Sequence, residues 1–182
     1  FAIEEVLNRI KYQELMATND GEPSDLRLAR HSEKISKRFQ DIIEISHAEG
    51  RLNTSISNKV RERYGIKKQA LRVLDPDHPS PTVTSMPDDL LHYREPRTLT
   101  VRENARLQGF PDWFSFHGKY TTGGHLRRQE VPRFTQVANA VPPLVARAFG
   151  ELLVEILGYQ EKPTSCSKPK SGARRRWRCA TT

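Results

Sequence analysis

The segment Asn139-Ala140-Val141 stands directly before Pro142 and Pro143, and prolines suit the first turn of a helix. Free backbone N–H groups at a helix start can meet a carboxylate. The short side chain of Asn139 adds a hydrogen-bond donor and an acceptor. Two interpretations are open: these residues line a ligand pocket, or Asn139 caps the helix entry.

Arginine side chains are spread through the chain, and the fork of a guanidinium suits phosphate oxygens. Such contacts position DNA without reading its sequence. The candidate phosphate contacts are Thr84, Arg94, Arg97, Arg127 and Arg128. For any one of these arginines, a solvated surface side chain is at least as good an interpretation.

Residues 100–103 have the form of a capping box, which predicts a short helix that stops at Gly109. The Thr100 hydroxyl can accept from the Glu103 amide, and the Glu103 side chain can reach back to the Thr100 amide. Glu103 and Arg106 are three positions apart, so they can pair on one helix face.

Cysteines and histidines indicate no metal chemistry. Cys166 and Cys179 form no Cys-x-x-Cys spacing and imply no disulfide framework, and the six histidines show no metal-ligand pattern. No apolar run approaches the roughly 20 residues of a membrane span, and we find no signal peptide. We therefore expect a cytoplasmic protein without a metal or a membrane partner.

The charge balance favours a polyanionic partner. The 182 residues carry a formal net charge of +8, and the pI is about 9.7. Part of the excess lies in an arginine cluster around Trp177, which also fits a disordered, solvated tail. The hydrophobic content of 36% is low for a self-sufficient globule and fits a piece that packs against another. We expect double-stranded DNA as a partner and association with the nucleoid.

Apolar spacing predicts the elements that position these residues. Helices are expected at residues 1–16, at 24–48, in one short stretch before Gly65, and from Pro142 to near Gly158. Residues 71–73 and 82–84 are rich in β-branched side chains and predict short strands. Residues 117–133 predict a polar loop. The last helix would turn an apolar face inward, formed by Leu144, Val145, Ala148, Leu152 and Ile156.

Two segments resemble a known family. Residues 97–112 (RTLTVRENARLQGFPD) are similar to the ninth conserved block of cytosine-5 DNA methyltransferases, and residues 136–143 (QVANAVPP) to the tenth, including its helix. Both occur in the family's order. Residues 79–85 resemble the end of the target-recognition region, and residues 31–39 a helix that bacterial members carry early in it. The resemblance covers roughly residues 22–157.

The resemblance implies a chemistry whose central groups are absent from this sequence. In the family the target cytosine is flipped out of the duplex. A cysteine that follows a proline adds to ring C6, a glutamate of a Glu-Asn-Val block assists at N3, and C5 takes the methyl group of S-adenosylmethionine. The sequence has no Pro-Cys pair and no glycine-rich cofactor turn, and its one Glu-Asn pair, Glu103-Asn104, is better explained as a cap. The implied partner is an N-terminal methyltransferase part that carries the Pro-Cys and Glu-Asn-Val blocks.

The resemblance also implies residue roles and a fold. Asn139, Ala140 and Val141 would line the methionine side of an S-adenosylmethionine pocket shared with the missing part. Arg102, Glu103 and Arg106 would hold the recognition region on the catalytic domain, a structural role that we favour over DNA contact. The expected fold class is α/β: the C-terminal fragment of a Rossmann-like methyltransferase, helix-rich with a few short strands. Its expected divisions are residues 1–21 (helix and linker), 22–98 (partial target-recognition region), 99–158 (segment completing the methyltransferase domain) and 159–182 (disordered basic tail).

The implied enzyme is a DNA (cytosine-5-)-methyltransferase of a restriction–modification system, and three hypotheses describe how this chain relates to it. The chain is a truncated piece that is inactive alone, a natural non-catalytic subunit of a split enzyme, or a stand-alone basic DNA-binding protein. The first residue is Phe1, which favours the first hypothesis.

Overall fold

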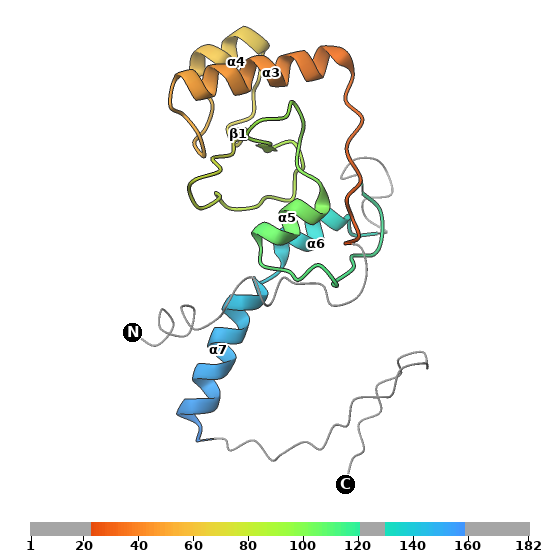
Figure 1. Cartoon of the computed structure of the whole chain (residues 1–182), viewed down its shortest axis with the longest axis vertical. Coiled ribbons are helices and arrows are strands. Elements are labelled where there is room, and N and C mark those ends of the chain that lie inside the picture. The colour runs from red at the N-terminus through yellow and green to blue at the C-terminus, as the bar shows by residue number, and fades with distance from the viewer. Residues whose placement is uncertain (1–22, 121–129, 159–182) are drawn as a thin grey trace.

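The structure is a computed structural model that describes residues 23–120 and 130–158 (Figure 1). The described elements are α3 (Glu33–Ala48), α4 (Asn58–Tyr64), β1 (Arg72–Val73), β2 (Leu90–Leu91), α5 (Val101–Leu107), α6 (Arg133–Asn139) and α7 (Pro143–Ile156). Figure 1 shows α3 and α4 together at one end, α5 and α6 in the middle, and α7 pointing away from the other labelled elements. Three predicted features lie outside the described residues: the helix at residues 1–16, the pair Arg127 and Arg128, and the tail.

Helix α3 forms the first core because its apolar side chains recur at helical spacing. Phe39, Ile42 and Ile43 are buried on one face and pack against β1, β2 and the segment around α4. The short helix expected before Gly65 is confirmed as α4, and Gly65 ends it in the left-handed conformation, with φ 61°.

The prediction that one helix spans residues 24–48 is wrong at its start. Residues 26–31 have no regular secondary structure, and α3 begins only at Glu33. Asp25 has a left-handed φ of 70°, and its side chain is buried against the elements around α5 and α6. The chain must then run extended to reach α3, so Leu28, which fits the helical spacing, is 57% exposed.

The sheet is small. Strands β1 and β2 pair in parallel, with Arg72 opposite Leu90 and Val73 opposite Leu91. The strand predicted at residues 71–73 is confirmed, whereas residues 82–84 form no strand. There the Thr84 hydroxyl donates to the Asp89 carboxylate at 2.7 Å, within a turn that precedes β2.

Helix α5 has the predicted capping box. The Glu103 amide donates to the Thr100 hydroxyl at 3.1 Å, and the Thr100 amide donates to the Glu103 carboxylate at 2.7 Å. The second core joins α5 to α6, a helix that the sequence analysis did not predict. Its buried residues are Val83, Val101, Ala105, Phe110, Phe116 and Val137.

Helix α7 begins at Pro143, one residue after the predicted start, and the described residues cover its apolar side chains only in part: Leu144, Val145 and Leu152 are half-buried. Ala148 is buried, whereas Leu153 is 55% and Ile156 68% exposed. By length and composition alone, Arg133–Ile156 qualifies as a candidate membrane span among the described residues, which the sequence analysis did not anticipate. The helix is interrupted between Asn139, the end of α6, and Pro143, the start of α7. Val137 in α6 is also fully buried in the second core, so the segment is not one continuous, exposed apolar helix.

Candidate functional site

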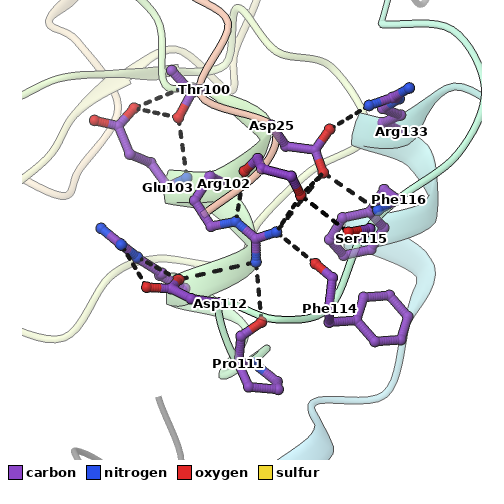
Figure 2. Close-up of polar contacts among 12 residues, drawn as sticks. Asp25, Thr100, Arg102, Glu103, Pro111, Asp112, Phe114, Ser115, Phe116 and Arg133 are labelled. Atoms are coloured by element: carbon purple, nitrogen blue, oxygen red, sulfur yellow. Dashed lines mark hydrogen bonds and ion pairs between the residues drawn. The ribbon is translucent and has the colours of Figure 1, made fainter. Parts of the chain in front are cut away.

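Arg102 lies at the centre of a buried polar cluster between α5 and the start of the described chain (Figure 2). Its side chain is completely buried. Nε donates to the Ser24 carbonyl at 2.9 Å, and Nη1 donates to the Pro111 carbonyl at 3.1 Å. Carboxylates of Asp25 and Asp112 lie 3.8 and 4.0 Å away. A buried guanidinium requires this density of acceptors, since an unpaired buried charge is costly.

Asp25 is the residue of this cluster that the sequence analysis missed. Its carboxylate accepts from Arg133, from the Tyr120 hydroxyl at 3.1 Å and from the Phe116 amide at 3.3 Å. Its carbonyl accepts from the Arg102 amide at 3.1 Å. Burial by itself raises the pKa of Asp25, but the donors, Arg133 foremost, bring the pKa below its ordinary value. Asp25 therefore ties the start of the described chain to α5, to α6 and to the loop between them.

Glu103 pairs with Arg97. Both guanidinium amino groups of Arg97 donate to the Glu103 carboxylate, at 2.8 and 2.9 Å. Burial raises the pKa of Glu103, but the bonds from Arg97 and Thr100 outweigh it and lower the pKa to about 2. The same pair raises the pKa of Arg97.

Arg106 binds Asp112. Two bonds of 2.8 and 2.6 Å join the side chains, and the bond to Arg106 is the largest cause of the lowered pKa of Asp112. The structure thus gives Glu103 and Arg106 separate partners, where the sequence analysis paired them with each other. Arg102, Glu103 and Arg106 each connect α5 to a neighbouring loop.

The candidate DNA contacts lie in different settings. Thr84 is bonded to Asp89, and the Arg97 side chain is only 16% exposed in its pair with Glu103. Arg94 is exposed, with its guanidinium 5.7 Å from the centre of the Tyr93 ring. Arg127 and Arg128 lie outside the described residues, so their contact with phosphate stays a prediction, as it does for the other three.

The structure adds two exposed arginines that the sequence analysis did not single out. Arg27 and Arg30 border a hollow of about 290 Å³ beside Thr98, Tyr120 and Phe134. Both lie in the extended segment that replaces the first part of the predicted helix. Their position beside the same hollow therefore depends on this extended conformation, which the sequence analysis did not predict.

The segment Asn139-Ala140-Val141 forms the junction of α6 and α7. Asn139 is the last residue of α6 and is exposed, and Val141 is 66% exposed. The interpretation of Asn139 as the cap of the following helix is wrong, because Pro142 occupies the cap position of α7 without a side-chain cap bond. Pro142 and Pro143 have no N–H, so backbone donors at this helix start are fewer than usual. The exposed amide of Asn139 is the evident side-chain donor. Within residues 23–120 and 130–158, no group of three or more His, Cys, Asp or Glu side chains could hold a metal.

Comparisons with known proteins show the family. The family model of C-5 cytosine-specific DNA methylases matches residues 3–155. Type II methyltransferase M.DdeI of Desulfomicrobium norvegicum is 32% identical over 157 residues, covering 80% of this chain and 36% of the relative. M.BbvI of Brevibacillus brevis is 33% identical over 178 residues, 92% of this chain and 44% of the relative. M.AquIB of Picosynechococcus is 47% identical over 101 residues, 54% of this chain and 73% of the relative.

A solved structure agrees with the family match. A protein described as a DNA modification methyltransferase encoded within a prophage (E. coli) superposes with a TM-score of 0.50 at 28% identity, over 75% of this chain and 30% of that chain. This chain belongs to the C-5 cytosine-specific DNA methylase family. Its relatives are named type II methyltransferases, in agreement with the expected setting of DNA methylation in restriction–modification.

Proposed function

We propose that this chain supplies the DNA-recognition and cofactor-closing part of a DNA cytosine-5 methyltransferase. It acts only together with a complementary part that carries the Pro-Cys nucleophile, the Glu-Asn-Val block and the glycine-rich cofactor turn. The apolar face of α7, which the described residues leave partly open, carries the proposal. The chain spans 36% of M.DdeI and 44% of M.BbvI, so most of such an enzyme lies outside the matched part.

The apolar side chains of α7 that the described residues leave exposed favour a partner on energetic grounds. Phe149, Leu153 and Ile156 recur at helical spacing and are 47%, 55% and 68% exposed. Fully burying such a side chain contributes about 1.5–3 kcal/mol. A contiguous apolar face of this kind marks an interaction surface, and the missing methyltransferase core is the partner that the family match supports.

Each C-terminal block has a part in this assembly. S-adenosylmethionine supplies the methyl group in this family. Asn139 and Val141 are exposed at the α6–α7 junction, so they are available to line a pocket that the complementary part completes. The Arg102–Asp25 cluster fixes the entry of the recognition region against α5 and α6. The recognition region would then hold DNA through Arg94, Arg97 and the other candidate contacts.

The complementary part can be the rest of the same polypeptide or a separate subunit. One observation supports a separate subunit. The 101 matched residues make up 73% of M.AquIB, so this relative is itself shorter than the present chain. In both arrangements the same apolar face is buried.

Association with an N-terminal C-5 methylase fragment that carries the three missing blocks tests the proposal. Sedimentation of the mixture should show a one-to-one complex. Leu153→Asp should abolish the complex, because docking would bury an unpaired carboxylate. Met86→Asp is the matched control, since Met86 is 36% exposed in a turn of the recognition region. Equal association of both variants would refute α7 as the docking face, and failure of the unaltered chain to associate, even with DNA and cofactor present, would refute the proposed function.

A further inference from the structure

A hollow of about 360 Å³ lies where the loop after α5 meets the start of α7. Pro111, Trp113 and Phe114 line it from the loop, and Leu144 and Arg147 line it from α7. The Trp113 side chain is 66% exposed. None of the roles assigned above uses this hollow.

A buried cation fixes the aromatic side of the hollow. The Arg102 guanidinium donates to the Pro111 carbonyl at 3.1 Å and to the Phe114 carbonyl (Figure 2). The Phe114 ring packs edge-on against buried Phe116, with centroids 5.0 Å apart. Because the loop backbone and the Phe114 ring are held at these points, ordering them on binding costs little further entropy, which favours tight contacts.

The chemistry of the hollow suits an apolar side chain. Its cation, Arg147, donates to the Glu151 carboxylate at 2.7 Å, which offsets part of the positive charge at the rim. Leu144 packs closely on the loop, since a Cβ added to Gly109 would lie 3.3 Å from it. The hollow therefore adjoins the first turn of α7. The exposed apolar side chains Phe149, Leu153 and Ile156 lie further along the same helix.

We propose that this hollow receives an apolar side chain of the complementary methyltransferase part, with Trp113 as the anchor of the contact. This inference rests on the proposed function. The occupant follows from continuity: the missing part covers α7, and the hollow lies at the start of α7. Tryptophan and arginine are enriched among the few residues that dominate interface energies, and Trp113 and Arg147 stand on opposite sides of the hollow.

The fluorescence of Trp113 tests the inference directly. The sequence has two tryptophans, so Trp177→Phe leaves Trp113 as the sole tryptophan of this chain, and an N-terminal fragment without tryptophan makes it the sole reporter of the mixture. On mixing with the N-terminal fragment, Trp113 emission should shift to shorter wavelength and become protected from acrylamide. Trp113→Ala should weaken association about 30-fold, the loss typical of a dominant interface residue. Trp113→Phe should lose less, because it keeps an aromatic wall. Equal thermal unfolding of the free variants shows that neither substitution unfolds the chain.

Two results would overturn the inference while the proposed function stands. In the first, the mixture associates and methylates, but Trp113 stays accessible to acrylamide and Trp113→Ala binds as tightly as the unaltered chain. In the second, duplex DNA alone protects Trp113, which would make the hollow a nucleic-acid contact. If the two parts never associate, the proposed function itself fails.

Discussion

Replacing Glu103 by Gln removes the charge of the Arg97–Glu103 pair but keeps the volume of the side chain. The pKa of Glu103 falls from 4.5 to about 2 on folding. One pKa unit corresponds to about 1.4 kcal/mol, so the ionised Glu103 carboxylate, bound by Arg97 and Thr100, contributes about 3 kcal/mol to the free energy of unfolding near pH 7. The side chain is only 28% exposed, so solvent screening reduces this figure little.

The pH dependence follows from the sign of the shift. A carboxyl group whose pKa is lowered by folding stabilises the protein above its unfolded pKa, here 4.5, and this stability is lost as the pH falls toward about 2. The difference between the unaltered chain and Glu103→Gln should therefore shrink to about 1.5 kcal/mol near pH 3.

Urea unfolding at several pH values measures this difference. Glu95→Gln is the matched control, because Glu95 binds the same Arg97 but its side chain is 56% exposed, and it should change stability little. A Glu103→Gln penalty that is the same near pH 3 and near pH 7, or equal to that of Glu95→Gln, would refute the assignment of the stabilisation to the ionised Glu103 carboxylate.

Three further perturbations test other parts of the structure. Asp25→Ala should lower the free energy of unfolding by about 3–5 kcal/mol, because it removes the carboxylate bound by partly buried Arg133 and one of the two carboxylates near buried Arg102. A loss under about 1 kcal/mol in urea unfolding, the value typical of an exposed ion pair, would contradict a stabilising role of Asp25. Duplex DNA binding, followed by anisotropy, should weaken steeply between about 50 and 200 mM salt, since phosphate neutralisation releases counterions; indifference to salt would exclude the basic surface as the contact. In the assembled enzyme, Asn139→Ala should raise the Michaelis constant for S-adenosylmethionine and leave that for DNA unchanged; unaltered cofactor dependence would remove Asn139 from the pocket.

Local signals in the sequence predicted the elements correctly where the cause lies within a few residues. Thr100 and Glu103 cap α5 because both partners belong to one helical turn. Pro143 starts α7 for a similarly local reason. The two blocks also placed the chain in its family, which the match over residues 3–155 shows.

Long-range contacts explain what the sequence analysis missed. Asp25 is bound by Arg133, 108 positions further along, and nothing near Asp25 signals that contact. The predicted helix starts only at Glu33, after an extended segment that follows Asp25. Thr84 is β-branched and suits a strand by composition, but its bond to Asp89 holds it in a turn.

Methyl transfer by the separated and mixed parts tests the central claim most directly. Labelled S-adenosylmethionine and duplex DNA are supplied to this chain, to the N-terminal fragment with the Pro-Cys block, and to their mixture. The account predicts label in cytosine for the mixture alone, and none when the cysteine of the fragment is replaced by alanine, since covalent activation of C6 needs that thiolate. Incorporation by this chain alone above a buffer control, or no incorporation by a mixture that forms the complex, would contradict it.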